Sequence, residues 1–217
     1  MRATARPRLR LQPRRPRGRP KAEDVEALED RLVEVARQAF VLNGYGATSL
    51  NEIAKSARVS KNTLYSRFAS KAALFQTIVA QQIRSADEEL HPGPEVRSLT
   101  AALKFFVEVA LKKSLDRRGL EINRLIMAEA YRFPELGATA EARFRLGVRS
   151  VADIIERYAE RDGVPCRNPV AAAEVFLYSI YGRYTFALST NRTLSGKAQA
   201  SWIDNAIRIF VAGRAQW

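Results

Sequence analysis

The stretch GYGATSLNEIAKSARVSKNTLYSRFASKAALF, residues 44–75, decides the fold of the first third of this 217-residue chain. Ser49 and Glu52 have the three-residue spacing of a capping box, in which each side chain accepts a hydrogen bond from the other residue's backbone N–H. We therefore expect a short helix over residues 50–56. Its apolar residues fall on one side, so this helix should pack against a partner.

A tight turn and a second short helix follow. Residues 57–60 form a four-residue turn, and Ser60 stands where it would cap a helix over 61–68. Leu64 and Phe68 provide the inward face of this helix, while its other side chains are polar. Two short helices joined by such a turn, the second carrying donors suited to phosphates and base edges, are typical of a helix-turn-helix that reads DNA. The competing interpretation is a solvated pair of surface helices.

The same stretch resembles the DNA-binding domain of the TetR family of bacterial one-component regulators. Together with the preceding helix, the similarity covers about residues 24–80. The positions that carry it are Gly44, Tyr45, Thr48, Ser49, Glu52, Ile53, Ala54, Val59, Ser60, Thr63, Leu64, Tyr65, Phe68, Lys71, Leu74 and Phe75. One position departs from the family: Arg58 stands in the turn where Gly is usual, and where Gly suits a positive φ. We expect Arg58 to accept some strain or a slightly altered turn, and its charge would reach a phosphate in return.

The resemblance implies roles for the polar positions. It implies that Thr48, at the start of the first short helix, and Lys71, which opens the following long helix, bind phosphates. The start of the second short helix would read bases, and its later positions would contact phosphates or the groove edge. The residues expected to contact DNA are Thr48, Arg58, Lys61, Asn62, Thr63, Tyr65, Arg67 and Lys71. For Tyr65, packing within the domain is the alternative.

Residues 1–21 form a basic arm. They hold nine basic residues and no acid, so the rest of the chain carries only +4 of the net charge of +13. Like charges and prolines at this density cannot bury enough apolar surface to order the segment, so we expect it to be disordered. Residues 15–21, RPRGRPK, are similar to an AT-hook, in which Arg17 and Arg19 would enter a narrow minor groove. A tail that binds only through its net charge is the alternative.

The whole chain is predicted to be all-α, with about nine helices and no strand alternation. We expect helices near residues 23–43, 50–56, 61–68, 70–90, 96–115, 117–131, 135–161, 168–189 and 196–213. A Pro/Gly-rich stretch at 91–94 marks the clearest boundary. We therefore expect a helix-turn-helix domain over 22–80, and the resemblance implies that residues 81–217 sense a ligand and dimerise.

The C-terminal half is rich in aromatic residues at helical spacing. Such residues usually form core, but tyrosine hydroxyls among apolar walls are also typical of a small-molecule pocket. Residues 124–136 are similar to TetR C-terminal domains of the AefR-like type. The residues expected to line a ligand pocket are Phe106, Glu129, Phe133, Tyr178 and Tyr181. For Glu129, which lies in a nearly apolar run, a structural hydrogen-bonding role is the alternative.

Two apolar stripes predict where copies of the chain would meet. One lies on the helix over 168–189 and the other on the helix over 196–213. The stripes comprise Val170, Ala173, Leu177, Ile180 and Tyr184, and Ile203, Ala206, Ile207 and Phe210. Both are too apolar to face water, and together with the family resemblance they predict a homodimer with a four-helix interface. A core within a single chain is the competing account.

Composition argues against several other classes. A single Cys and a single His exclude an intrachain disulfide and cysteine-based zinc sites, and they argue against a serine triad. Nucleotide-binding glycine loops are absent. No segment is apolar enough to span a membrane, and the N-terminus lacks the apolar region of a secretory signal, so a cytoplasmic protein without metal or cofactor is expected.

The resemblance implies a function. It implies a homodimeric repressor that binds a palindromic operator in double-stranded DNA and releases it when a small apolar effector enters the C-terminal domain. One alternative is a regulator of the same kind without a small-molecule effector, constitutive or controlled by a protein partner. A more remote alternative is a helical enzyme with a basic tail.

Overall fold

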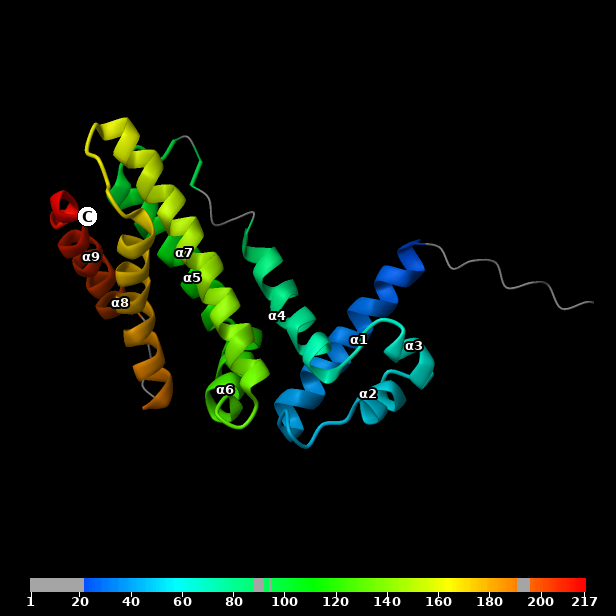
Figure 1. Cartoon of the computed structure of the whole chain (residues 1–217). Coiled ribbons are helices and arrows are strands. Elements are labelled where there is room, and N and C mark those ends of the chain that lie inside the picture. The colour runs from blue at the N-terminus through cyan, green and yellow to red at the C-terminus, as the bar shows by residue number, and fades with distance from the viewer. Residues whose placement is uncertain (1–21, 88–91, 94, 191–195) are drawn as a thin grey trace, which may run out of the picture.

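The computed structural model of the protein describes residues 22–87, 92–93, 95–190 and 196–217. The predicted arm, with Arg17 and Arg19, lies outside these residues. The described residues form nine α-helices and one short 3-10 helix, with no strand, so the predicted all-α class is confirmed (Figure 1). The elements are α1 (Ala22–Asn43), α2 (Leu50–Ser56), α3 (Lys61–Tyr65), α4 (Lys71–Asp87), α5 (Leu99–Leu115), α6 (Arg117–Glu129), α7 (Pro134–Asp162), α8 (Pro169–Ser189), α9 (Gly196–Ala212) and η1 (Arg214–Gln216).

Helix ends differ from the predicted ends where a cap or a tighter turn intervenes. Helix α3 ends at Tyr65 rather than at residue 68, because the N–H of Arg67 bonds to the carbonyl of Leu64, three residues back. Helix α5 begins at Leu99 rather than at 96, because the side chain of Ser98 accepts a hydrogen bond from the first turn.

Two apolar cores organise the chain. The first core joins α1–α4 and also takes in buried side chains from the other half, such as Ile122 of α6 and Leu136 of α7. The rings of Phe40, Tyr45 and Phe75 pack at its centre, with centroids 5.3–5.9 Å apart. The second core lies among α5, α7, α8 and α9. Because α6 and the start of α7 belong to the first core, the C-terminal helices are packed directly onto the N-terminal ones.

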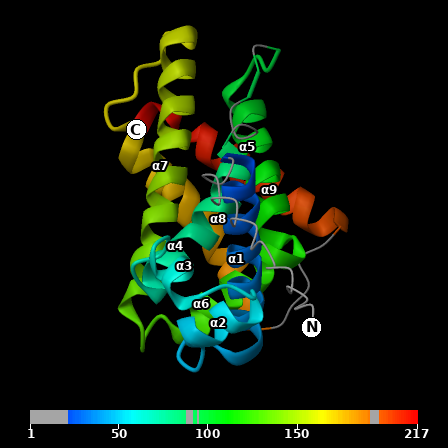
Figure 2. The same ribbon diagram turned by 90° about the vertical axis from the view of Figure 1, so that its right-hand side faces the viewer.

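The figures show how these helices lie. Helices α1–α3 occupy one side of the molecule and α5–α9 the other, with α4 running between them (Figure 1). Viewed from the N-terminal side, α2 and α3 face outward in the lower half of the molecule (Figure 2). Long helices α7 and α8 pack along each other, and α9 contacts α5 and α8. In the part of the chain that is described, no helix combines the length and apolar character needed to cross a membrane.

The prediction that the two apolar stripes face a second copy of the chain is wrong for most of their side chains. Ala173, Leu177, Ile180 and Tyr184 are buried in this chain's own core, and so are Ile203 and Ile207. The competing account, a core within one chain, is correct for them. Helix α8 is apolar on nearly every side, so its sequence period did not reveal the inward face. Val170 is the member of the stripes that is exposed, and the other large apolar side chains exposed on these helices are Val175, Tyr178 and Phe186 of α8 and Ile209 of α9.

Candidate DNA-binding site and its link to the C-terminal domain

Both predicted caps of the helix-turn-helix are confirmed. The N–H of Glu52 donates to Ser49 Oγ at 3.2 Å, and the N–H of Ser49 donates to Glu52 Oε2 at 3.0 Å, which completes the capping box of α2. At the start of α3, the N–H of Thr63 donates to Ser60 Oγ at 3.0 Å. These bonds hold both short helices at defined first residues, so the side chains of α3 have a fixed orientation.

The turn between the two helices adopts a backbone shape that favours glycine but contains Arg58. The N–H of Val59 bonds to the carbonyl of Ala54 at 3.0 Å and the N–H of Arg58 to that of Lys55 at 3.1 Å, the paired bonds of a Schellman motif. Arg58 has φ +56°, and it is the one non-glycine residue with positive φ among the described residues. The strain expected from the sequence is therefore present, and the Arg58 side chain is exposed.

Helix α3 presents a polar surface. Lys61 and Asn62 are exposed, and Tyr65 is 49% exposed, which argues against the packing alternative for Tyr65. Leu64, between them, is fully buried and anchors the helix to the domain. Three of the expected DNA contacts thus lie together on one outward side, where a groove of DNA could reach them.

Three other expected contacts are engaged within the domain. Thr48 is 2% exposed, and its hydroxyl is bonded to the carbonyls of Ala39 and Gly44. The Thr63 hydroxyl pairs with that of Ser60 at 2.8 Å, and a guanidinium nitrogen of Arg67 lies 3.5 Å from Glu29 of α1. Contacts of these three side chains with DNA stay predictions, and each would compete with an internal bond.

The Lys71 ammonium lies on the loop between α1 and α2. Its Nζ donates to the carbonyls of Tyr45 at 2.8 Å and Thr48 at 3.1 Å, and it sits 4.5 Å from the centre of the Tyr45 ring. The phosphate contact implied by the resemblance stays a prediction. The sequence does not predict that Lys71 holds this loop, because nothing in it indicates that loop carbonyls converge on the Lys71 ammonium.

The same loop is held from the other side by the end of α6 and the start of α7. The carboxylate of Glu129 accepts hydrogen bonds from the N–H groups of Tyr45 at 2.8 Å and Gly46 at 3.0 Å. The Tyr45 hydroxyl donates to Glu135 at 2.9 Å, and burial raises the pKa of Tyr45. The ring of Phe133 lies so close to Gly46 that a Cβ there would approach it to 2.8 Å. We call Glu129, Phe133, Glu135 and Lys71 the loop clamp.

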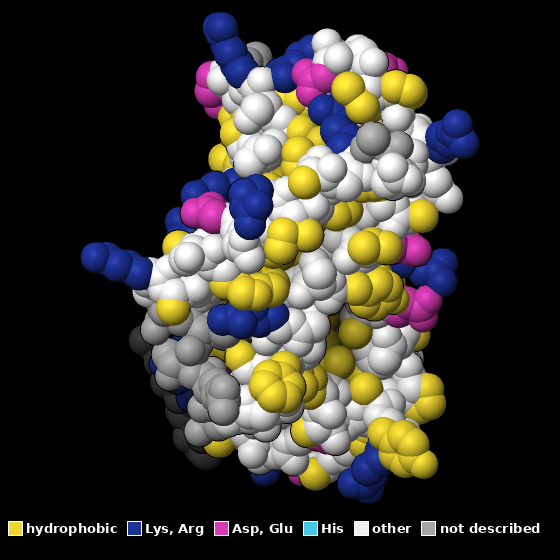
Figure 3. All heavy atoms as spheres, turned by 90° about the vertical axis from the view of Figure 1, so that its left-hand side faces the viewer, with side chains coloured by type: hydrophobic (Ala, Val, Ile, Leu, Met, Phe, Trp, Pro, Cys, Tyr) yellow, Lys and Arg dark blue, Asp and Glu magenta, His cyan; other side chains and the backbone are white. Residues whose placement is uncertain are grey.

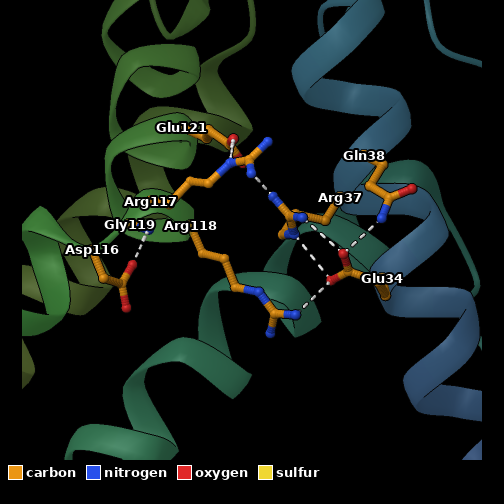
Figure 4. Close-up of polar contacts among 8 residues, drawn as sticks. All are labelled: Glu34, Arg37, Gln38, Asp116, Arg117, Arg118, Gly119 and Glu121. Atoms are coloured by element: carbon orange, nitrogen blue, oxygen red, sulfur yellow. Dashed lines mark hydrogen bonds and ion pairs between the residues drawn. The ribbon is translucent and has the colours of Figure 1, made fainter.

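A second link joins α1 to the beginning of α6 (Figure 4). The guanidinium of Arg37 donates to both carboxylate oxygens of Glu34, at 2.7 and 3.1 Å, and also to Glu121 of α6. Hydrogen bonds from Arg37 lower the pKa of Glu34 to about 2. Arg118 of α6 approaches Glu34 to 3.5 Å. The beginning of α6 is therefore bound to α1, and its end to the loop between α1 and α2.

The five residues predicted to line a ligand pocket do not come together. Phe106 is buried in the second core, whereas Glu129 and Phe133 belong to the loop clamp. Glu129 therefore has the structural hydrogen-bonding role that the sequence left open as the alternative. Tyr178 and Tyr181 lie on α8, where Tyr178 is 65% exposed and Tyr181 is half-buried. Both rings contact Phe144 of α7. A different hollow, a cleft of about 580 Å³, lies between α8, α9 and the C-terminal residues.

Family models match both halves of the chain. Residues 32–78 match the model of bacterial regulatory proteins of the tetR family, and residues 101–213 match the C-terminal domain of AefR-like transcriptional repressors. The second match alone covers more than half of the chain.

Individual relatives agree with the family models. The chain is 23% identical over 185 residues to the HTH-type transcriptional regulator YvkB of Bacillus subtilis, covering 84% of this chain and 95% of YvkB. It is 26% identical over 161 residues to the HTH-type transcriptional regulator UidR of Escherichia coli K12, covering 73% and 81%. The solved structure of the flavonoid-responsive regulator FrrA superposes with a TM-score of 0.69 at 28% identity, covering 88% and 96%. These relatives are transcriptional regulators and not enzymes, and the chain belongs to the TetR family of helix-turn-helix transcriptional regulators.

Proposed function

We propose that the protein is a homodimeric repressor that binds a palindromic operator and releases it when a small effector with an apolar body enters the C-terminal domain. Residues 22–80 would bind DNA, and residues 81–217 would sense the effector and dimerise. The observation that carries the proposal is the outward polar side of α3, presented next to a loop that α6 holds through Glu129.

DNA recognition would fall to the start of α3. In a helix-turn-helix, the N-terminal residues of the second helix contact base edges in the major groove. Here those residues are Lys61 and Asn62, both exposed, and the Asn62 amide is suited to a bidentate contact with adenine. Arg58 in the turn is exposed beside them and would bind a phosphate.

Dimerisation would use the exposed apolar face of α8 and α9. Apolar side chains gather along the middle of the face that these helices present (Figure 3). Val175, Tyr178 and Phe186 of α8 are each more than half exposed, and so is Ile209 of α9. Exposed apolar patches of this kind mark association surfaces. A two-fold dimer would place two copies of α3 on a two-fold symmetric operator.

Release requires the effector to favour a conformation in which the two recognition helices no longer match the groove. Helix α6 is the element through which this preference would pass, since the Arg37 ion pairs bind its beginning to α1 and the loop clamp binds its end to the loop between α1 and α2. A shift of α6 would move the loop before α2. The alternative, a regulator without an effector, would have the same links but no ligand that biases them.

Selection of genomic fragments bound by the purified protein tests the DNA-binding part. We expect the selected fragments to share an inverted repeat, with half-sites about one helical turn or a multiple of it apart. Asn62→Ala should reduce the enrichment and relax the shared sequence, while Asn51→Ala, which removes an exposed amide from α2, should retain both. Fragments without a shared repeat would overturn the palindromic operator.

Sedimentation tests the dimer. We expect the wild type to be dimeric at micromolar concentration. Val175→Asp together with Phe186→Asp should give a folded monomer, because two charges would be placed on the proposed interface. Glu174→Gln, an exposed change on the same helix, should leave the dimer intact. A monomeric wild type would overturn the interface.

A further inference from the structure

A polar cluster lies at the edge of the second core, where α6, α7 and α8 meet. Asn123 of α6 is 5% exposed. Its Nδ2 donates to the hydroxyl of Tyr184 at 3.1 Å, and its Oδ1 accepts from Nη2 of Arg143 at 2.7 Å. The Tyr184 hydroxyl in turn donates to the carbonyl of Ser114 at 2.9 Å. These bonds fix the position of the Arg143 guanidinium.

Arg143 retains hydrogen-bonding capacity that the described residues do not use. A guanidinium has five N–H donors, and the bond to Asn123 is the one hydrogen bond that Arg143 makes within the described part of the chain. No carboxylate of that part lies within ion-pair distance, although the side chain is half-buried. By contrast Arg145, two residues on, pairs with Glu141 at 2.5 Å. A half-buried guanidinium without a counterion is a site that an anion would stabilise.

Tyr181 adds a second unused donor. Its ring contacts Phe144 and Tyr184, but its hydroxyl makes no hydrogen bond to any residue that the structure describes. Burial raises the pKa of both Tyr181 and Tyr184, and the positive charge of Arg143 opposes that rise at both hydroxyls. Arg143 reaches the Tyr184 hydroxyl through Asn123, and the Tyr181 ring lies 6.5 Å from the Tyr184 ring, so the three side chains belong to one cluster. The raised pKa keeps the Tyr181 hydroxyl protonated and able to donate.

Aromatic rings lead from the proposed dimer face to this cluster. The ring of Tyr178, which is 65% exposed in the single chain and would lie at that face, is 4.6 Å from the ring of Phe144. Phe144 lies 6.0 Å from Tyr181, and Tyr181 lies 6.5 Å from Tyr184. These centroid distances are those of favourable aromatic contacts. A planar aromatic body would continue the row, with its polar end at Arg143.

We infer that Arg143 and Tyr181 bind the carboxylate of a small aromatic acid, whose ring packs against Phe144 and the tyrosines of α8. This inference rests on the proposed function, because it names the chemical class of the effector. A carboxylate fits because it accepts two parallel N–H bonds from a guanidinium and a third from a phenol. The bound acid would touch α6 through Arg143 and Asn123, and thereby reach the helix that carries Glu129.

The test is binding of four probes to the full-length protein, measured by calorimetry and thermal shift. The probes are benzoate, cinnamate, cinnamamide and inorganic phosphate. We expect an acid to raise the Tm in a concentration-dependent way. Cinnamamide, which has the ring without the charge, and phosphate, which has the charge without the ring, should bind about tenfold more weakly or not at all. Equal effects of cinnamate and cinnamamide, equal effects of cinnamate and phosphate, or no effect of either acid would overturn the inference.

Variants locate the site. Arg143→Gln should weaken acid binding about tenfold, and Tyr181→Phe, which keeps the ring, about threefold or more. Arg149→Gln is the matched control, since it removes an exposed arginine from the same helix. Arg143→Lys retains the charge and should bind with intermediate affinity, which keeps the test valid if Arg143→Gln fails to fold. Equal affinity of Arg143→Lys and wild type, or equal losses in Arg143→Gln and Arg149→Gln, would contradict the site.

Operator release separates this inference from the proposed function. Release by a neutral compound, with no response to either acid, would leave the proposed repressor standing and overturn the acid site. Binding of an acid that depends on Arg143 but leaves operator affinity unchanged would support the site and overturn effector-controlled release.

Discussion

The carboxylate of Glu129, the last residue of α6, accepts a 2.8 Å hydrogen bond from the backbone N–H of Tyr45, 84 positions earlier. Tyr45 lies in the loop that leads into the helix-turn-helix. The contact therefore joins the two halves of the chain at the segment that sets the position of α2. Lys71 holds the same loop from α4, so its backbone is bonded on both its N–H and its carbonyl sides.

Glu129→Ala should reduce the free energy of unfolding by about 1–3 kcal/mol, because the N–H groups of Tyr45 and Gly46 lose their acceptor. Glu129→Gln retains one acceptor oxygen and should cost less. Glu141→Ala, which removes a surface carboxylate paired with Arg145, should cost under about 1 kcal/mol. Urea unfolding measures all three, and equal losses for Glu129→Ala and Glu141→Ala would contradict the clamp.

The free energy of unfolding should decrease as the pH is lowered, because the Glu34 carboxylate becomes protonated. Its pKa in the folded protein is about 2, against an ordinary value of 4.5, so the folded state favours the ionised form. The resulting stability is present above about pH 5 and is lost as the pH falls towards 2. Glu34→Gln should flatten the dependence of Tm on pH between 7 and 3. An unchanged slope would mean that the Arg37 pairs contribute nothing to acid sensitivity, and Glu26→Gln, an exposed residue of α1, is the control.

Arg58→Gly should stabilise the protein by about 0.5–1 kcal/mol, because it removes a side chain from a left-handed backbone conformation at φ +56°. Lys55→Gly removes the same charge but places glycine inside α2, where it should destabilise by about 1 kcal/mol. If Arg58 also binds a phosphate, Arg58→Gly should reduce the salt slope of operator binding by about one, while Lys55→Gly leaves it unchanged. Destabilisation by Arg58→Gly would contradict the strain.

Measurements of operator binding should distinguish the role of Asn62 from that of Lys71. Asn62→Ala should weaken operator binding by about 1–3 kcal/mol and relax sequence preference, because the exposed amide reads a base edge. Lys71→Ala should weaken all sequences alike and reduce the salt slope by about one, if its ammonium binds a phosphate.

The position of Lys71 adds a second expectation to this comparison. Because its Nζ bonds to the carbonyls of Tyr45 and Thr48, Lys71→Ala should also lower the Tm, which Asn62→Ala should not. A lowered Tm with an unchanged salt slope would confine Lys71 to the loop, and a changed sequence preference would contradict its assignment as a phosphate contact.

Deleting residues 1–20 should weaken operator binding and flatten its salt dependence, because fewer counterions are released. The Tm should change little. If Arg17 and Arg19 enter the minor groove, replacing both with Ala should reproduce most of the loss, and more so on operators with AT-rich flanks. Replacing Arg6 and Arg8 is the control for net charge. Equal losses on AT-rich and GC-rich flanks would leave a tail that binds by charge alone.

Local features of the fold follow from the sequence. The capping roles of Ser49, Glu52 and Ser60 depend on groups three residues apart, so the sequence suffices to predict them. The expectation of strain at Arg58 came from the family resemblance, because Gly is usual at that position, and the structure gives the physical reason, a Schellman turn with a left-handed residue there. In the candidate site, the exposure of Lys61 and Asn62 follows from the helical period around buried Leu64.

Long-range partners could not be predicted in the same way. Thr48 and Lys71 turn to backbone carbonyls, and every residue supplies a carbonyl, so no residue type signals the contact. The apolar stripe of α8 illustrates a second limit. A helix that is apolar on nearly every side has no period to orient it, and Leu177 is buried while Val175 is exposed.

The sequence by itself determined that this chain is all-α, where its helices begin and end to within a few residues, and which family its helix-turn-helix resembles. Those properties depend on neighbours within one or two helical turns. Only the tertiary structure decided that Glu129 holds the loop at Tyr45 and that Arg143 bonds to Asn123 without a carboxylate partner among the described residues. Packing of whole helices brings such groups together, and the free energy of that packing is spread over many apolar contacts and assigned to no single motif.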